Sequence, residues 1–211
     1  MGFTGSSEGR MPGGLARSIQ IDKVHKYCQL VRMPDEKSQE RDAQRRAEIL
    51  QAARECFLQF GYAKTSLDDI ARRANISRPL IYRKFKNKDD IFTAVIEELF
   101  EERYPRAEQV LASPGTRRDK LLRLYEILLL EPWDELMGAP MAADFYEVCS
   151  RLFPQVEAKH ARRQLELTQA LLESKELSEV FMLAVDGLQG DLPATRVLRR
   201  RLQLLAERFV P

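Results

Sequence analysis

From about Arg45 to its end, the chain repeats apolar residues at the spacing of α-helices, and no stretch alternates apolar and polar residues over more than a few positions. In the segment "RRAEILQAARECFLQFG", one apolar stripe is followed by Gly61, a residue that commonly ends a helix. The stripe consists of Ile49, Ala53, Cys56, Phe57 and Phe60. Prolines and capping residues divide the remainder into further helical segments. The spacing therefore predicts an all-α fold.

Residues 1–40 lack this helical pattern. The first fourteen residues are rich in Gly, Ser and Pro, and residues 33–42, "MPDEKSQERD", are almost wholly polar. A segment of this kind buries too little apolar surface to offset the entropy lost on ordering. We therefore expect residues 1–40 to form a disordered N-terminal arm. A second interpretation is that the assigned start is misplaced and that translation begins at Met33.

The composition argues against several classes of function. Lys and Arg number 34 against 32 Asp and Glu, so only local clustering of charge can indicate a polyanionic partner. The cysteines and histidines are too scattered for a disulfide framework or a zinc site, and reduced thiols in a cytoplasmic protein without metal or cofactor are expected. These residues are Cys28, Cys56, Cys149, His25 and His160. No apolar run could span a bilayer and no catalytic or phosphate-loop motif occurs, so neither a membrane protein nor an enzyme is expected.

Two short helices joined by a tight turn are predicted between residues 66 and 85. Ser66 and Asp69 have the spacing of a capping box, and Asn75 tolerates the left-handed backbone of a tight turn. Ser77 is expected to cap the next helix, with Pro79 in its first turn, where a missing N–H costs nothing. The apolar positions of the unit are Leu67, Ile70, Ala71, Ile76, Ile81 and Phe85. This arrangement is a helix-turn-helix unit.

A cluster of positive charge coincides with the second of these helices. Residues 72–88 contain no acidic residue and seven basic ones, Arg72, Arg73, Arg78, Arg83, Lys84, Lys86 and Lys88. The outer face of the helix would present Arg78, Pro79, Leu80, Tyr82, Arg83 and Lys84. An α-helix fits the major groove of B-DNA, where Arg can bond guanine while Lys and Tyr hydroxyls bind phosphates. A basic helix face is often only a solvated surface, but its place in a helix-turn-helix favours DNA binding.

The segment "FGYAKTSLDDIARRANISRPLIYRKFKNKDDIFTAVI" resembles the N-terminal domain of the tetracycline-repressor (TetR) family of bacterial transcription regulators, over about residues 45–100. The matching positions are Gly61, Tyr62, Thr65, Ser66, Ile70, Ala71, Ala74, Ile76, Ser77, Ile81, Tyr82, Phe85 and Lys88. Asn75 departs from the family's usual glycine and Lys84 from its common histidine.

The resemblance implies roles for individual side chains. It implies contacts to the DNA backbone from Thr65, Ser66, Tyr82, Lys84 and Lys88. It also implies that Arg78, Pro79, Leu80 and Arg83 face the bases. The expected domains are the arm, 1–40, a helix-turn-helix domain with its connecting helix, 41–104, and a helical ligand-binding and dimerisation domain, 105–211.

Two features of the C-terminal half suggest further sites. The last two helices carry apolar stripes, and the resemblance implies that they pair with a second subunit; packing within one monomer is the alternative. The expected interface consists of Phe181, Ala184, Leu188, Leu198, Leu202 and Leu205.

Aromatic and Met side chains near Pro132, Gly138 and Pro140 suit a pocket for a small apolar or amphipathic ligand, or equally an ordinary core. These side chains are Trp133, Met137, Met141, Phe145 and Tyr146.

The sequence thus predicts a homodimeric, ligand-responsive regulator, a repressor, that binds a pseudo-palindromic DNA operator. Two alternatives remain open: a DNA-binding regulator without a small-molecule effector, and a helical protein-interaction module whose basic face has no DNA target.

Overall fold

The structure is a computed structural model that describes residues 36–210, and every regular element in that range is a helix, which confirms the all-α prediction. The elements are α2 (Glu36–Phe60), α3 (Leu67–Arg73), α4 (Arg78–Lys84), α5 (Lys88–Glu101), α6 (Tyr104–Ala112), α7 (Arg117–Tyr125), the π-helix η1 (Glu126–Leu130), α8 (Glu131–Met137), α9 (Ala142–Leu152), α10 (Pro154–Leu172), α11 (Lys175–Gln189) and α12 (Thr195–Phe209). No helix within residues 36–210 combines the length and apolar composition that crossing a membrane requires.

Helix α2 begins earlier than the sequence pattern suggests. Residues 36–40, expected to belong to the arm, are helical, because the polar segment 36–45 continues the helix of the apolar stripe. Contacts place residues up to Arg45 in one unit and those from Arg46 onward in another. Gly61, with φ of 83°, ends α2 as predicted. The rest of the expected arm and the proposed start at Met33 lie outside the described residues.

A first hydrophobic core joins the helix-turn-helix to the elements that follow it. Phe92 of α5 lies at its centre, with ring centroids 5.1 Å from Phe57, 4.9 Å from Phe145 and 5.0 Å from Phe153. Aromatic pairs at these separations add stabilisation beyond their buried area. Because Phe145 and Phe153 belong to α9 and its C-terminal cap, this core includes residues on both sides of the boundary expected at residue 104.

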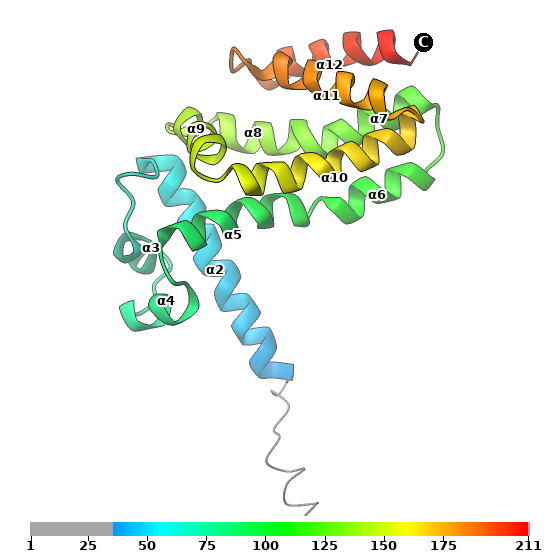
Figure 1. Ribbon diagram of the computed structural model, residues 1–211. Coiled ribbons are helices and arrows are strands. Elements are labelled where there is room, and N and C mark those ends of the chain that lie inside the picture. The colour runs from blue at the N-terminus through cyan, green and yellow to red at the C-terminus, as the bar shows by residue number, and fades with distance from the viewer. Residues whose placement is uncertain (1–35, 211) are drawn as a thin grey trace, which may run out of the picture. The chain divides into compact units, whose positions relative to one another are not determined.

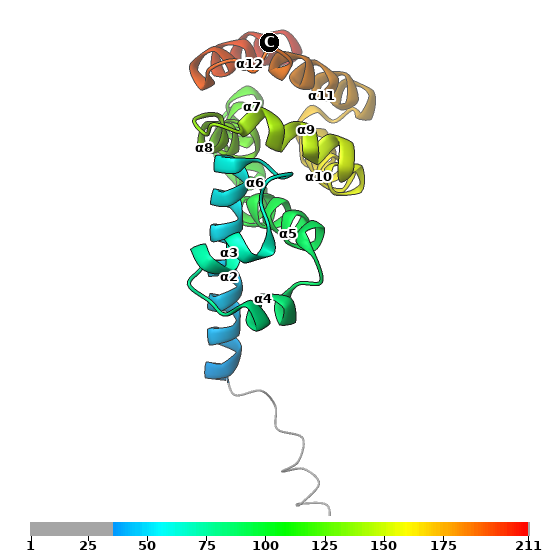
Figure 2. The same ribbon diagram turned by 90° about the vertical axis from the view of Figure 1, so that its left-hand side faces the viewer.

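A second core holds the C-terminal helices together. It is built from α6, α7, η1, α8, α10, α11 and α12, with Tyr125, Trp133 and Phe181 among its fully buried side chains. In this part of the chain α10 lies against α6, α7 and α11, while α12 packs on α7, η1 and α11 (Figure 1). Viewed from the side, α3 and α4 lie next to α5, away from α11 and α12 (Figure 2).

Two prolines lie in the first turns of helices. Pro132 does not end a helix: the backbone widens into the π-helix η1 and continues as α8, with Pro132 in its first turn. A wider turn accommodates a residue that lacks an N–H and would otherwise clash with the preceding turn. The connecting helix α5 ends at Glu101, and Pro105 lies in the first turn of the next helix, α6.

Candidate functional site

The predicted helix-turn-helix is formed by α3, a tight turn and α4. The Asp69 amide donates to Ser66 Oγ at 3.2 Å and the Ser66 amide donates to Asp69 Oδ2 at 3.0 Å, which completes the expected capping box. Asn75 has φ of 51°, the left-handed conformation predicted for the turn. The Ile76 amide donates to the Ala71 carbonyl at 3.0 Å and closes it. The fully buried side chains of the unit are Ile70, Ala71, Ile81 and Phe85.

The opposite face of α4 is accessible. Of the six side chains expected there, Arg78, Pro79, Tyr82 and Arg83 are exposed, and Leu80 and Lys84 are half-buried. Tyr82 keeps 51% of its surface exposed, which is unusual for a large aromatic residue and leaves its hydroxyl available. Ser77 occupies the N-cap position, but its side chain makes no capping hydrogen bond, contrary to expectation.

Acidic side chains from outside residues 72–88 neutralise part of the basic cluster. Among the described residues, Arg72 pairs with Asp69, Arg73 with Glu55 and Arg78 with Asp68. Arg78 Nε lies 2.5 Å from Asp68 Oδ1, although that buried oxygen has no aligned hydrogen-bond donor. Arg83 and Lys86 are exposed and form no ion pair within the described residues. The positive charge that remains available is therefore concentrated near the C-terminal half of α4.

Two of the predicted DNA-backbone contacts, Thr65 and Lys88, form hydrogen bonds within the protein. Thr65 is 3% exposed, and its hydroxyl donates to the Gly61 carbonyl at 2.8 Å and the Cys56 carbonyl at 3.2 Å. It thereby ties the segment after α2 to the last turn of that helix. Lys88 donates to the Tyr62 carbonyl at 2.8 Å and lies 4.2 Å from the centre of the Tyr62 ring. Ser66 is exposed, with its hydroxyl bonded to Asp69.

Tyr62 is a central residue that the sequence analysis treated only as a motif position. Its hydroxyl is hydrogen-bonded to Asp89, and its backbone amide donates to Asp144 Oδ2 at 3.0 Å. Burial, together with the Asp89 carboxylate, raises the pKa of Tyr62 above its ordinary value, so the hydroxyl stays protonated. The segment between α2 and α3 is thus tied to α5 and α9. Nothing in the sequence pointed to Asp144.

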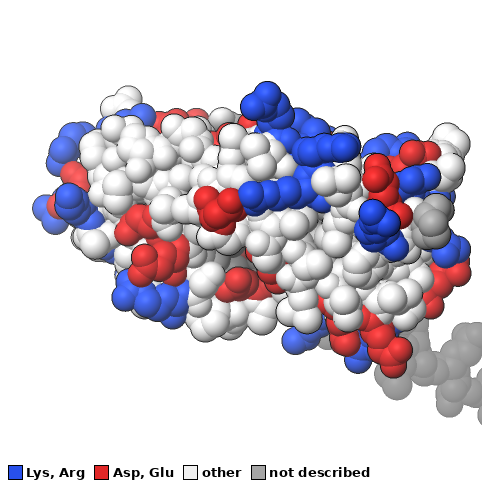
Figure 3. Space-filling model, turned by 90° about the horizontal axis from the view of Figure 1, so that it is seen from above, with Lys and Arg blue, Asp and Glu red and all other residues white. Residues whose placement is uncertain are grey.

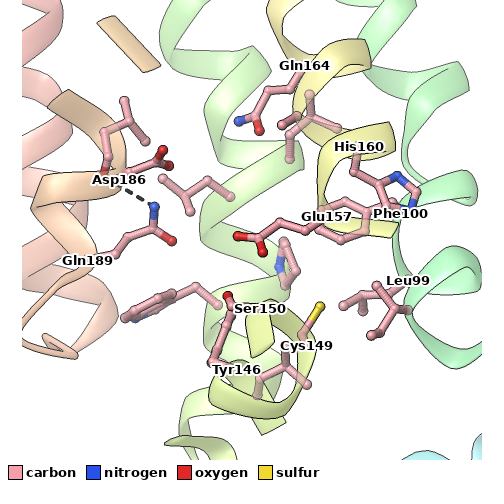
Figure 4. A pocket seen from close by; sticks show the side chains of 18 of the residues that line it. Leu99, Phe100, Tyr146, Cys149, Ser150, Glu157, His160, Gln164, Asp186 and Gln189 are labelled. Atoms are coloured by element: carbon pink, nitrogen blue, oxygen red, sulfur yellow. Dashed lines mark hydrogen bonds between the residues drawn. The ribbon is translucent and has the colours of Figure 1, made fainter. Parts of the chain in front are cut away.

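A cavity of about 470 Å³ lies among α5, η1, α8, α9, α10 and α11 (Figure 4). Three of the five residues expected around a pocket line it: Trp133, Phe145 and Tyr146. Met137 and Met141 are not among its lining residues. Met141 turns towards the end of α2, where its amide donates to the Leu58 carbonyl at 2.9 Å, and Met137 packs against the second core. A pocket of this volume is large enough for a drug-sized molecule.

Polar groups enter this cavity from three helices. Glu157, His160 and Gln164 come from α10, Asp186 and Gln189 from α11, and Ser150 from α9 (Figure 4). His160 Nδ1 is hydrogen-bonded to the Tyr104 hydroxyl at 2.7 Å, whereas its buried Nε2 has no partner. Burial lowers the pKa of His160, so the ring is neutral at neutral pH. Burial raises the pKa of Asp186, and the neighbouring Glu157 carboxylate raises it further.

The apolar stripes of α11 and α12 are divided between the interior and the surface. Of the expected interface residues, Phe181, Leu198 and Leu202 are buried in the second core, and Ala184, Leu188 and Leu205 are half-buried. The stripes lie partly inward because α11 and α12 complete the core above α7 and η1. The large apolar side chains exposed on these helices are instead Leu177, Val180, Leu183, Val197 and Leu204. We refer to these five as the outer apolar face. Seen from above, uncharged side chains cover much of the surface (Figure 3).

Sequence comparison places the helix-turn-helix among known regulators. Residues 49–95 match the family described as "Bacterial regulatory proteins, tetR family". The chain is 35% identical over 107 residues to the probable HTH-type transcriptional regulator ArpR of Pseudomonas putida, an alignment that covers 48% of this chain and 49% of that protein. It spans between a third and a half of the length of the curated relatives that it matches first.

Comparison with solved structures shows a similar fold over most of the chain. A transcriptional regulator of the TetR/AcrR family from Thermobifida fusca has a TM-score of 0.59 at 24% identity, covering 77% of this chain and 97% of that one. A regulator from Saccharomonospora viridis, whose crystal structure contains choline, has a TM-score of 0.63 at 19% identity, covering 80% of this chain and 98% of that one. At these identities the likeness concerns the fold alone.

Proposed function

Because the chain belongs to the TetR family of transcriptional regulators, we propose that it acts in the cytoplasm as a homodimeric repressor, released from its operator when a small molecule binds in the cavity. The family consists of regulators and not of enzymes. Within this proposal, residues 41–104 form the DNA-binding domain and residues 105–211 the ligand-binding and dimerisation domain.

The observation that carries the proposal is the exposed face of α4 on a correctly formed helix-turn-helix. Arg78, Pro79 and Leu80 stand in its first turn, and the first turn of a recognition helix reaches the base edges in the major groove. Tyr82, Arg83 and Lys84 follow on the exposed side, where hydroxyl and cationic groups can bind guanine or phosphate. Ser66, at the exposed start of α3, is a further phosphate contact.

Dimerisation is proposed through the outer apolar face. A two-fold axis makes such an interface self-complementary, so a single face of α11 and α12 serves both subunits. Exposed leucines and valines on adjacent helices are the kind of surface that a partner covers. Gly187, also on α11, has open space where a side chain would be and permits a partner helix to approach closely.

Selection of DNA fragments by the purified protein tests the proposed function. We expect enrichment of a pseudo-palindrome whose half-sites are about 10 base pairs or a multiple apart from centre to centre, because two copies of α4 must enter major grooves on one side of the duplex. Binding that shows no sequence preference above its salt-dependent background would contradict the proposal and favour a protein-interaction module.

The contact between α9 and Tyr62 provides a route from the cavity to the reading helix. Phe145 and Tyr146 of α9 line the cavity, and the adjacent Asp144 holds the Tyr62 amide just before α3. A ligand that displaces α9 therefore acts on the segment leading into the helix-turn-helix. The connecting helix α5 offers a second route, since Ile96 and Leu99 line the same cavity.

We expect Asp144→Ala to weaken this coupling while leaving both binding reactions intact. Allosteric coupling typically changes affinity about 5- to 150-fold, and loss of one of two routes should reduce this factor severalfold. The measurement is operator affinity with and without a saturating ligand found by thermal-shift screening. Glu147→Ala is the matched control, since Glu147 lies on the same helix and pairs only locally with Arg151. An unchanged coupling factor in Asp144→Ala would exclude the Tyr62 route.

A further inference from the structure

The charged residues around the cavity are all of one sign. Glu157 and Asp186 line it, and no Lys or Arg is among its lining residues. Within residues 36–210, neither carboxylate forms an ion pair or a side-chain hydrogen bond. Other acidic side chains form ion pairs with arginine: Glu131 pairs with Arg106, and Asp191 pairs with Arg201. The cavity therefore contains unpaired negative charge.

Glu157 and Asp186 are exposed side chains that line the cavity, and two carboxylates facing the same space repel each other unless a positive charge compensates them. Desolvation raises the pKa of Asp186 on α11, and the Glu157 carboxylate on α10 raises it further. In Figure 4 the Glu157 side chain points towards the middle of the cavity, and Asp186 enters from the other side. A cation between them would relieve this repulsion.

Aromatic rings form the walls around these carboxylates. Trp133, Tyr146 and Phe100 line the cavity, and the faces of aromatic rings attract cations. The neutral His160 ring stacks on Phe100 with centroids 4.4 Å apart and leaves its buried Nε2 without a partner. The remaining lining is largely Leu, Ile and Val, which suits an apolar body.

We propose that the cavity binds an organic cation: an amine or quaternary ammonium group, held between Glu157 and Asp186, on an apolar or aromatic body that packs against Trp133 and Tyr146. This assignment rests on the proposed function, because it names the ligand class of the same pocket. It disfavours organic acids, since a carboxylate ligand would meet two like charges and no counter-ion.

Three probes with one body and different head groups test the ligand class: phenylbutylamine, phenylbutanol and phenylbutyrate at neutral pH. Trp133 is the chain's one tryptophan and lines the cavity, so its fluorescence reports binding directly. The amine is expected to bind at least ~10-fold more tightly than the alcohol, and the carboxylate more weakly than either. Equal affinities, a preference for the carboxylate, or no binding of the amine would overturn the proposal.

Charge-neutralising variants test whether Glu157 and Asp186 cause the preference for the amine over the alcohol. Glu157→Gln combined with Asp186→Asn should remove most of the ~10-fold preference for the amine and leave the affinity for the alcohol unchanged. Each single substitution should have part of this effect, and thermal unfolding checks that each variant folds. Glu179→Gln is the matched control, because Glu179 lies on α11 outside the cavity and pairs with Lys175. A preference that survives in the double variant would refute the assignment to these carboxylates.

The probes also separate the ligand class from the regulatory role. Amine binding is measured without DNA, and operator release is measured afterwards with the same probe. Selective binding of the amine without release of the operator supports the cation site and contradicts the proposed repressor mechanism. Release by the alcohol and the amine alike, at equal affinities, supports the repressor mechanism and overturns the cation site.

Discussion

Replacing Leu183 by glutamate should convert the proposed dimer into a monomer and abolish specific operator binding. Leu183 is 71% exposed, the largest fraction among the apolar side chains of α11 and α12, and it lies beside Val180 on the outer apolar face. In a two-fold interface the substitution occurs twice, so two uncompensated carboxylates would be buried at the same contact. At a few kcal/mol for each, the dimer should dissociate ~1,000-fold more readily.

Loss of the dimer removes one of the two reading helices from each complex. A monomer contacts one half-site and loses the contribution of the other, so affinity should fall towards the non-specific level, typically ~10³- to 10⁷-fold weaker than specific binding. Analytical ultracentrifugation gives the oligomeric state, and titration of the selected operator gives the affinity. Leu152→Glu is the control, since Leu152 is 46% exposed but lies on α9, outside the outer apolar face. A Leu183→Glu protein that stays dimeric would place the interface elsewhere.

Arg83→Ala should cause the largest loss of operator affinity among single changes on α4. Its guanidinium is exposed and forms no ion pair within residues 36–210, so it is available to a guanine edge. A good bidentate contact contributes ~1–3 kcal/mol, and the dimer carries two copies, which gives a total loss of ~2–6 kcal/mol for the preferred sequence. Discrimination should also relax at the base pairs that the arginine reads.

The operator affinities of two other arginine variants, Arg78→Ala and Arg162→Ala, show whether the loss is specific to Arg83. Arg78→Ala should cost less, because Arg78 must first leave the ion pair with Asp68. Arg162→Ala, on the exposed side of α10, should leave operator affinity unchanged. The readout is the affinity for the selected operator and for single-base variants of it, at constant salt. If Arg83→Ala bound the operator with wild-type affinity and preference, α4 could not be the reading helix in the orientation proposed.

Local features of the helix-turn-helix could be predicted because they depend on neighbouring residues. The Ser66–Asp69 capping box, the left-handed Asn75 and the end of α2 at Gly61 each follow from the chemistry of one to four adjacent residues. The capping prediction at Ser77 was wrong in its detail, since the position is correct but the side chain forms no bond. Helical spacing likewise indicated the all-α fold, because the period of apolar residues is a property of the segment itself.

Which group each side chain binds depends on residues that are distant in the sequence. Thr65 and Lys88 have the residue types of phosphate contacts, yet the end of α2 and Tyr62 occupy them. Arg72, Arg73 and Arg78 meet acids outside residues 72–88, so the charge on the surface differs from the charge in the sequence. A single sequence contains no signal for such pairs, because their residues are brought together only when helices pack.

The sequence by itself determined the all-α class, the turn between α3 and α4 and the exposed basic face of α4, since periodicity, caps and charge are local properties. Tertiary structure alone decided which apolar residues of α11 and α12 face outward, because both sides of these helices carry leucines and only packing on α7 and η1 selects one. It also decided the chemistry of the cavity. Glu157 and Asp186 are ordinary helix-surface acids in the sequence, and they become an unpaired couple only because α10 and α11 enclose the same space.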